Sequence, residues 1–113
     1  MYNYKVKLDR VIDGDTIDVD IDLGFGVWLK KQRLRLFGIN APESRTRDLE
    51  EKARGLAAKA WLEKELQGDI RITTAKDSKG KFGRWLAVVH VKDAPQSINK
   101  TMIEQGHAVK AEY

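Results

Sequence analysis

The segment TIDVDIDL, residues 16–23, alternates strictly between polar and apolar side chains. Its isoleucines and valine share one face, and its threonine and aspartates share the other. A period of two residues is that of a β-strand with one buried face, whereas a helix repeats every 3.6 residues. An Asp13-Gly14-Asp15 turn separates this segment from a looser alternating run at residues 2–12. The chain is therefore expected to begin with a β-hairpin.

The rest of the chain supplies three further strands and two helices. Gly24-Phe25-Gly26 loosens the backbone before the third strand, and Gly38-to-Arg47 forms a loop whose proline excludes helical geometry just before it. The pattern predicts, in order, a strand at 27–37, a helix at 48–66, strands at 69–75 and 84–91, and a short helix from Ser97 to Gly106. The inward side chains expected in that short helix are Ile98, Met102 and Ile103.

The first helix carries a capping signal and an unusual glycine. Asp48 with Glu51 three residues later forms a capping-box arrangement, and Gly68 follows the predicted end. Gly55 lies mid-helix, where glycine costs about 1 kcal/mol relative to alanine, so another backbone is expected to approach closely at this point. The face expected to be buried consists of Leu49, Ala53, Leu56, Ala57, Ala60 and Trp61.

Length and element order together predict the fold class. A chain of 113 residues, 42% of them hydrophobic, can bury the core of one domain, residues 1–113. Five short strands with a helix between the third and fourth follow the order of a five-stranded OB-fold barrel. The expected class is α+β, mainly β, with the short helix after strand five.

Composition narrows the classes of function. The chain has no cysteine, so a disulfide framework, a thiolate metal site and a thiol nucleophile are excluded. The first 16 residues lack the apolar core of a signal peptide, which predicts a cytoplasmic protein, or a secreted one if a signal peptide was removed. A net charge of +4 tilts the expectation towards anionic partners, and no membrane partner is expected. A monomer is expected.

Carboxylates stand at two turns. Asp13 and Asp15 flank Gly14, which is ordinary hairpin chemistry or, alternatively, a set of oxygen ligands of the kind that Ca²⁺ prefers. Asp18 and Asp20 could supplement such a site but are more simply explained as solvated strand residues.

Basic residues alternate on the third strand and return later in the chain. Arg33 and Arg35 occupy the face opposite Leu34 and Leu36, as solvated surface residues or as phosphate ligands. The segment GKFGR at residues 80–84 is a basic hairpin turn or, alternatively, part of a nucleotide pocket.

Taken together, these segments form a pattern that is more specific than any one of them. VIDGDT, then RLRLFGINAPE, then a helix, then KFGR resemble the staphylococcal (micrococcal) nuclease family in order and spacing over almost the whole chain. The resemblance implies a calcium-dependent endonuclease, a phosphodiesterase that hydrolyses DNA and RNA with low sequence specificity. It also implies roles by position: metal ligands Asp15, Asn40 and the backbone carbonyl of Ala41; catalytic residues Arg35, Glu43 and Arg84; substrate contacts Lys81, Phe82 and Tyr113.

The implied roles agree with the chemistry of phosphodiester hydrolysis. Arg35 and Arg84 can bracket the phosphorus with fork-like hydrogen bonds to its charged oxygens. Glu43 can take a proton from the attacking water or position that water, and the sequence leaves both open. One cation bound at Asp15 would withdraw charge and orient the substrate.

Three positions depart from the family pattern. Asn40 stands where an aspartate is usual, Ala41 where the best-known member has threonine, and Phe82 where tyrosine is usual. With Asp15 and Glu43 as the ionised ligands, weaker metal binding is expected, and a metal other than Ca²⁺ is possible. The alternative is a catalytically weak or inactive module of the same fold that binds nucleic acid or protein. A generic single-strand binder would need more exposed aromatics than Phe25 and Trp28 on strands two and three.

Overall fold

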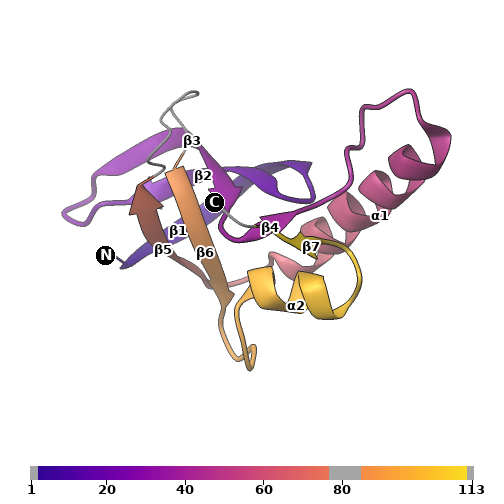
Figure 1. The fold of residues 1–113 in the computed structure, drawn as a ribbon. Helices are drawn as coiled ribbons and strands as arrows, with labels where there is room; N and C mark the ends of the chain where they lie inside the picture. Colours follow the sequence, from indigo (N-terminus) through magenta and orange to yellow (C-terminus); the bar gives the residue numbers. More distant parts are fainter. Residues whose placement is uncertain (1–2, 77–84, 112–113) are drawn as a thin grey trace.

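The computed structural model describes residues 3–76 and 85–111 and contains nine elements (Figure 1). Their bounds are β1 Asn3–Asp13, β2 Thr16–Asp22, β3 Trp28–Leu36, β4 Ile39–Asn40, α1 Leu49–Glu65, β5 Ile70–Lys76, β6 Trp85–Val91, α2 Ile98–Glu104 and β7 Val109–Lys110.

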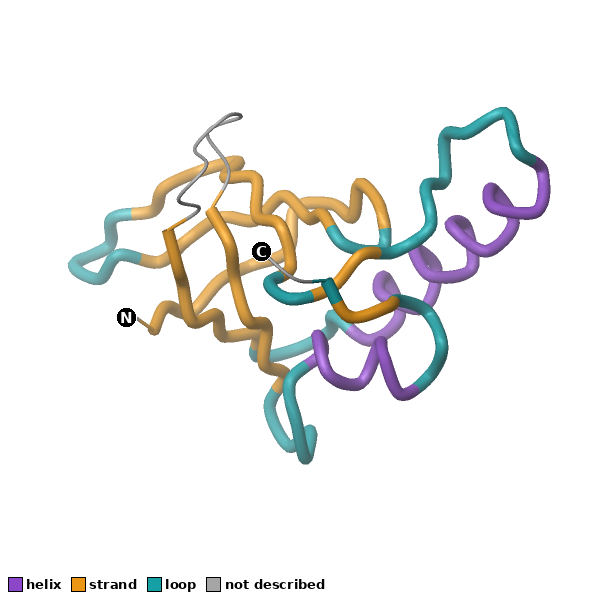
Figure 2. The backbone as a smooth tube through the Cα atoms, viewed as in Figure 1, coloured by secondary structure: helices purple, strands orange, loops and turns teal. Residues whose placement is uncertain are grey.

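Five strands close into a barrel in the order β1-β2-β3-β6-β5, and β5 returns to pair with β1. All neighbours are antiparallel except β3 and β6, which run parallel. Helix α1 lies between β3 and β5 in sequence and covers one end of the barrel together with α2 (Figures 1 and 2). The predicted α+β, OB-type barrel with this helix placement is confirmed.

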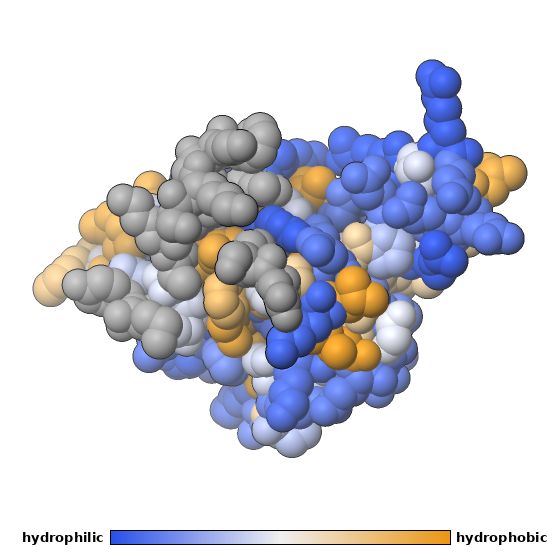
Figure 3. Space-filling model, viewed as in Figure 1, coloured by the Kyte–Doolittle hydropathy of each residue, from blue (hydrophilic) through white to orange (hydrophobic). Residues whose placement is uncertain are grey.

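The barrel core follows from the alternation in β2 and β3. Ile17 and Val19 are fully buried, and so are Leu34 and Leu36 on the neighbouring strand. The opposite end of the β2–β3 hairpin carries apolar side chains into solvent: Phe25 is fully exposed at 105%. Figure 3 shows this apolar surface at the left, whereas the end of the molecule that carries α1 is largely hydrophilic.

Helix α1 begins as predicted but turns a different face inward. The Asp48 side chain accepts hydrogen bonds from the backbone N–H groups of Glu50 and Glu51 at 3.1 and 3.3 Å. Most of the expected buried face is wrong, since Leu49 is 79% exposed and Leu56 47% exposed, although Trp61 does pack against the core. The residues that α1 does bury are Gly55, Ala58 and Leu62. Small residues face inward because the helix packs at close range against the segment that follows β4.

Helix α2 is capped by Ser97, whose hydroxyl accepts a hydrogen bond from the Lys100 N–H at 3.2 Å. Ile98 and Met102 are buried as predicted, but Ile103 is 37% exposed, so its predicted inward placement is wrong. A neighbouring residue, Asn99, is buried instead. Its amide links β6 to the end of β3: Oδ1 accepts from Val89 N at 2.9 Å, and Nδ2 donates to the carbonyls of Phe37 (2.9 Å) and Ala87 (3.0 Å).

Two short strands complete the fold outside the barrel. In the β4–β7 sheet, which the sequence patterns did not predict, Asn40 pairs with Val109 and Ile39 with Lys110. This pairing fixes the segment after β3 beside the C-terminal part of the chain.

Within the part of the chain that the structure describes, no helix is long and apolar enough to cross a membrane.

Candidate functional site

The β1–β2 turn is wedged between the segment after β4 and helix α1. Gly14 at its centre is buried, and a Cβ added there would lie 2.8 Å from the Cβ atoms of both Ala41 and Ala58. Only glycine allows this approach, because real Cβ atoms do not come so close to a carbon. The turn therefore places Asp13 and Asp15 directly against the loop that follows β4.

Asp15 and Arg35 form an ion pair at the centre of this region. Arg35 Nη1 lies 3.0 Å from Asp15 Oδ2, and the two side chains are only 13% and 16% exposed. The pair follows from the strand register, in which Thr16 lies opposite Arg35. Arg35 Nη2 also donates to the Ile39 carbonyl at 3.1 Å and to the side-chain oxygen of Asn40. The guanidinium is thus held in one orientation by three partners.

The loop from Asn40 to Ser44 is held to the turn by further contacts. The Ala41 N–H donates to Asp15 Oδ2 at 3.0 Å, and the Ser44 hydroxyl donates to Asp13. On its other side the loop rests on α1, since a Cβ at Gly55 would lie 2.4 Å from the Glu43 carbonyl oxygen. The prediction that another backbone approaches Gly55 is confirmed. These contacts fix the backbone on both sides of Glu43.

A polar hollow of about 430 Å³ opens between the turn, the end of β3 and the loop. Its lining includes five residues to which site roles had been assigned: Asp15, Arg35, Asn40, Ala41 and Glu43. Asp13, Thr16, Pro42 and Glu51 complete it. The four other predicted site residues, Lys81, Phe82, Arg84 and Tyr113, lie outside the described residues.

Sequence reasoning missed Ser44, which is 5% exposed and bonded to Asp13. No local pattern distinguishes a loop serine with a buried partner from an ordinary surface serine. Glu51 was interpreted only as part of a helix cap, although it also lines the hollow. Both residues owe their place to tertiary contacts between the turn, the loop and α1.

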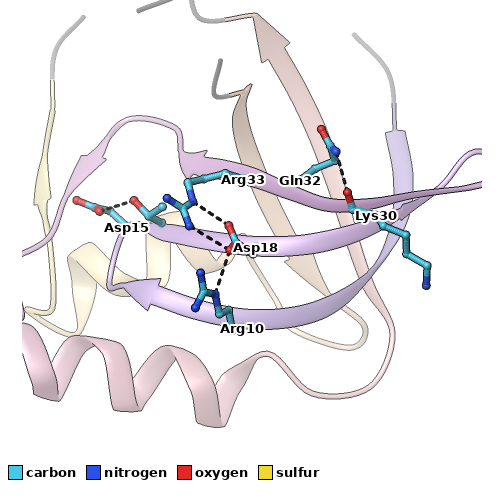
Figure 4. A network of polar contacts seen from close by, with 7 residues as sticks. Arg10, Asp15, Asp18, Lys30, Gln32 and Arg33 are labelled. Carbon is cyan, nitrogen blue, oxygen red and sulfur yellow. Dashed lines mark hydrogen bonds and ion pairs between the residues drawn. The ribbon is translucent and has the colours of Figure 1, made fainter. Parts of the chain in front are cut away.

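Asp18 is buried beside two arginines, so its interpretation as a solvated strand residue is wrong (Figure 4). Its Oδ1 accepts from Arg33 Nε at 2.9 Å, and its Oδ2 accepts from Arg33 Nη2 at 3.2 Å and from Arg10 Nε at 3.1 Å. The hydrogen bond from Arg33 is the largest influence on the pKa of Asp18, which lies below its ordinary value although burial opposes the shift. Asp18 is therefore ionised at neutral pH.

The candidate metal-ligand atoms around the hollow are oxygen atoms, which hard cations such as Ca²⁺ prefer. The Asp15 carboxylate, the Asn40 amide oxygen and the Ala41 carbonyl fit this chemistry, but only the first carries a charge. Among the described residues, no three aspartate, glutamate, histidine or cysteine side chains gather closely enough to hold a metal ion. The Asp15, Asn40 and Ala41 groups thus fit the ligand chemistry of a hard cation, with Asp15 as their only charged member.

The fold and the hollow define a small OB-type barrel with an arginine–carboxylate site suited to charged oxygens. The chain belongs to the staphylococcal nuclease family: the sequence model described as "Staphylococcal nuclease homologue" matches residues 33–113. The chain is 34% identical over 107 residues to a thermonuclease of Staphylococcus intermedius, and the match covers 94% of this chain and 58% of the relative.

Two further relatives show the same extent of similarity. A thermonuclease of Staphylococcus hyicus is 32% identical over 103 residues, covering 90% of this chain and 56% of the relative. The protein ParB of Escherichia coli is 33% identical over 106 residues, covering 88% and 52%. The chain therefore spans between about half and three fifths of the length of these curated relatives.

Proposed function

We propose that this chain is a nuclease domain that hydrolyses phosphodiester bonds of DNA and RNA with low sequence specificity, assisted by a divalent cation, in the first instance Ca²⁺. The observation that supports it best is the convergence of Arg35, Asp15 and Glu43 on one polar hollow. Phosphoryl transfer needs a cationic group to stabilise the phosphate and a carboxylate to act on water. Here Arg35, largely buried and paired with Asp15, can supply the first, and Glu43 on its fixed loop can supply the second.

Arg35 is the residue proposed to bind the scissile phosphate. Its side chain is only 13% exposed, so its charge is poorly screened by solvent. Nη1 is buried and makes no well-aligned hydrogen bond with a described residue, although it faces Asp15. A phosphate bound in the hollow would meet the positive charge of this guanidinium, which would stabilise the charge that builds on the phosphoryl group during the reaction.

Glu43 is the residue proposed to act on water. Its side chain lines the hollow on a loop whose backbone is fixed against α1 and against the β1–β2 turn. When the water oxygen attacks phosphorus, its proton passes to the Glu43 carboxylate, or Glu43 orients the water for the attack. The bond between phosphorus and the leaving oxygen then breaks, and the leaving alkoxide takes a proton from solvent water.

Asp15, the Asn40 side chain and the Ala41 carbonyl are the proposed ligands of the cation. A bound divalent cation supplies Lewis-acid charge withdrawal from the phosphate. Arg84 is proposed as the second arginine of the clamp, and Lys81, Phe82 and Tyr113 as contacts to the nucleotide; all four proposals rest on position in the family motif.

One observation favours the second candidate, a binding module with little or no catalytic activity. The Asn40 oxygen accepts a hydrogen bond from Arg35, and the site has one charged ligand, so a cation must compete for oxygens that are already bonded. Such a module would bind nucleic acid and cleave none at any metal concentration.

Cleavage of a plasmid and of a single strand separates the two candidates. We expect cleavage with millimolar Ca²⁺, none with excess EDTA, and a loss of about 10²–10⁴-fold in kcat in Glu43→Gln, because a positioned general base contributes about that much. The control Glu63→Gln removes an exposed carboxylate from α1, outside the hollow, and should cleave as the wild type does. Binding without cleavage at every metal concentration would support the binding module instead.

Replacing Asn40 by aspartate tests the cation site. Asn40→Asp keeps an oxygen acceptor for Arg35 Nη2 and gives the proposed ligand set a second charged member besides Asp15, so Ca²⁺ should bind about tenfold more tightly. Titration calorimetry measures the change directly. Asn3→Asp adds the same charge to the exposed start of β1 and serves as the control. Equal or weaker Ca²⁺ binding in Asn40→Asp would show that residue 40 is not a ligand.

A further inference from the structure

The outer face of β3 carries three cations, and each is paired with an aspartate of β2 or of the turn that precedes β2. Arg35 pairs with Asp15 at the β1–β2 turn, Arg33 with Asp18, and Lys30 with Asp20 at 3.3 Å. Asp18 and Asp20 lie on the face of β2 opposite the buried isoleucines, so their two pairs face outward, whereas the Asp15–Arg35 pair lines the hollow. Figure 4 shows this line from Asp15, through Arg33 and Asp18, to Lys30.

Arg10 of β1 adds a fourth cation to the middle of the line, where it shares Asp18 with Arg33. We call Arg35, Arg33, Arg10 and Lys30 the cation row. Its four positive charges exceed the three carboxylates that hold them. The row therefore begins at the proposed scissile phosphate and continues across the barrel surface with a positive excess.

Asp18 lies opposite Arg10 on β1 and Arg33 on β3, but joining these strands uses only part of the hydrogen-bonding capacity of the two arginines. One ion pair would join β2 to β3, yet the Asp18 carboxylate, 9% exposed, is shared by two guanidiniums that remain 64% and 46% exposed. Among the described residues, Arg10 hydrogen-bonds only through Nε, which leaves both its terminal amino groups for another acceptor. The buried carboxylate thus orients two arginines whose remaining donors reach solvent.

The spacing of the row suits a polynucleotide strand. Residues two apart on a β-strand are separated by roughly 6.6–6.8 Å, and stacked nucleotides of one strand advance by about 3.4 Å each. Arg33 is therefore within two stacked nucleotides, or one extended nucleotide, of Arg35. At the far end, Lys30 lies 5.7 Å from the centre of the Trp28 ring, which is 40% exposed and offers a face on which a base can stack.

We propose that the cation row binds the single strand of the polynucleotide substrate beyond the scissile phosphate, with Arg33 and Arg10 together holding a neighbouring phosphate. This proposal rests on the nuclease function proposed above. Asp18 acts as a positioning residue, since it touches both arginines and lies too deep to meet the strand. The row makes long substrates bind more tightly than a dinucleotide.

The test compares a 20-nucleotide single strand with a dinucleotide that has one phosphodiester bond. The variant is Arg10→Gln/Asp18→Asn/Arg33→Gln, in which no buried carboxylate is left unpaired. We expect the ratio of kcat/KM for the 20-mer over the dinucleotide to fall about tenfold. In fluorescence anisotropy with EDTA, the slope of log Kd for the 20-mer against log salt should fall by about 0.7, because Arg33 and Arg10 together neutralise one phosphate.

The control is Arg71→Gln, which removes one positive charge and so changes the net charge by the same amount as the triple variant. Arg71 is 61% exposed, lies on β5 and pairs with Asp69 at 3.8 Å. Equal losses on both substrates, an unchanged salt slope, or the same slope change in Arg71→Gln would overturn the cation row. If the wild-type chain cleaves neither substrate, the proposed nuclease activity is wrong, and the anisotropy measurement alone decides whether the row binds the strand.

Discussion

Replacing Arg35 by lysine is expected to lower kcat for phosphodiester cleavage by about 10²–10³-fold, the loss seen when one donor to a developing oxyanion is removed. Lysine keeps the positive charge but lacks the planar guanidinium, which donates hydrogen bonds from two terminal nitrogens in a fixed geometry. In the structure Nη1 and Nη2 of Arg35 point at different partners, Asp15 and the Ile39 carbonyl, and a single ammonium cannot reach both. Steady-state kinetics on a single-stranded substrate at saturating metal measure the effect.

The same substitution at a position outside the hollow is the control for general effects of replacing arginine by lysine. Arg71→Lys makes the same replacement at an exposed, ion-paired position on β5 and should leave kcat as it is. Thermal unfolding of Arg35→Lys shows whether the site still folds. If the folded variant retains kcat within about threefold of the wild type, Arg35 supplies only charge.

The Gly55 contact could be predicted because it depends on a local rule: glycine inside a helix is costly unless something approaches it. The assignment of Asp15 and Arg35 to one site depended instead on the order and spacing of the family motifs. The ion pair between them was not predicted, because it requires the pairing of β2 with β3.

The buried face of α1 could not be read from hydrophobicity. Leucine and alanine occur around most of the helix, and the side that faces inward combines the small residues Gly55 and Ala58 with the fully buried Leu62. Close packing against a backbone requires small side chains, whereas a prediction from hydrophobicity assigns the large apolar side chains to the buried face. The predicted face, which included Leu49 and Leu56, was wrong for this reason.

Asp18 illustrates a second limit. Alternation places its side chain on the outer face of β2, where solvent is the default expectation. Its burial depends on Arg10 and Arg33, which reach it from two other strands. The β1–β2 register shifts between Leu8 and Arg10, and no sequence pattern located this irregularity. Pairing across three strands has to be known before such a carboxylate can be recognised.

Gly55→Ala is expected to destabilise the protein, although alanine is the better helix former. The substitution gains about 1 kcal/mol of helix propensity. The new Cβ would lie 2.4 Å from the Glu43 carbonyl oxygen, 2.5 Å from its carbon and 2.7 Å from the Ser44 nitrogen. All three are backbone atoms that cannot rotate away, so the loop or the helix must move. Overpacking of this kind costs about 1–3 kcal/mol or more, and we expect a net loss of about 2 kcal/mol.

The same shift should reach the chemistry, because the atoms that are pushed belong to Glu43. A displacement of about 1 Å in a catalytic group can cost 10²-fold in rate, so folded Gly55→Ala should lose roughly 10-fold or more in kcat. Chemical denaturation gives the free energy of unfolding, and kinetics well below the unfolding temperature give kcat. Ala57→Gly, at an exposed position of α1, changes only helix propensity and should cost about 1 kcal/mol with kcat retained. If Gly55→Ala instead raises stability by that amount, the loop yields freely, and Gly55 does not hold Glu43 in place.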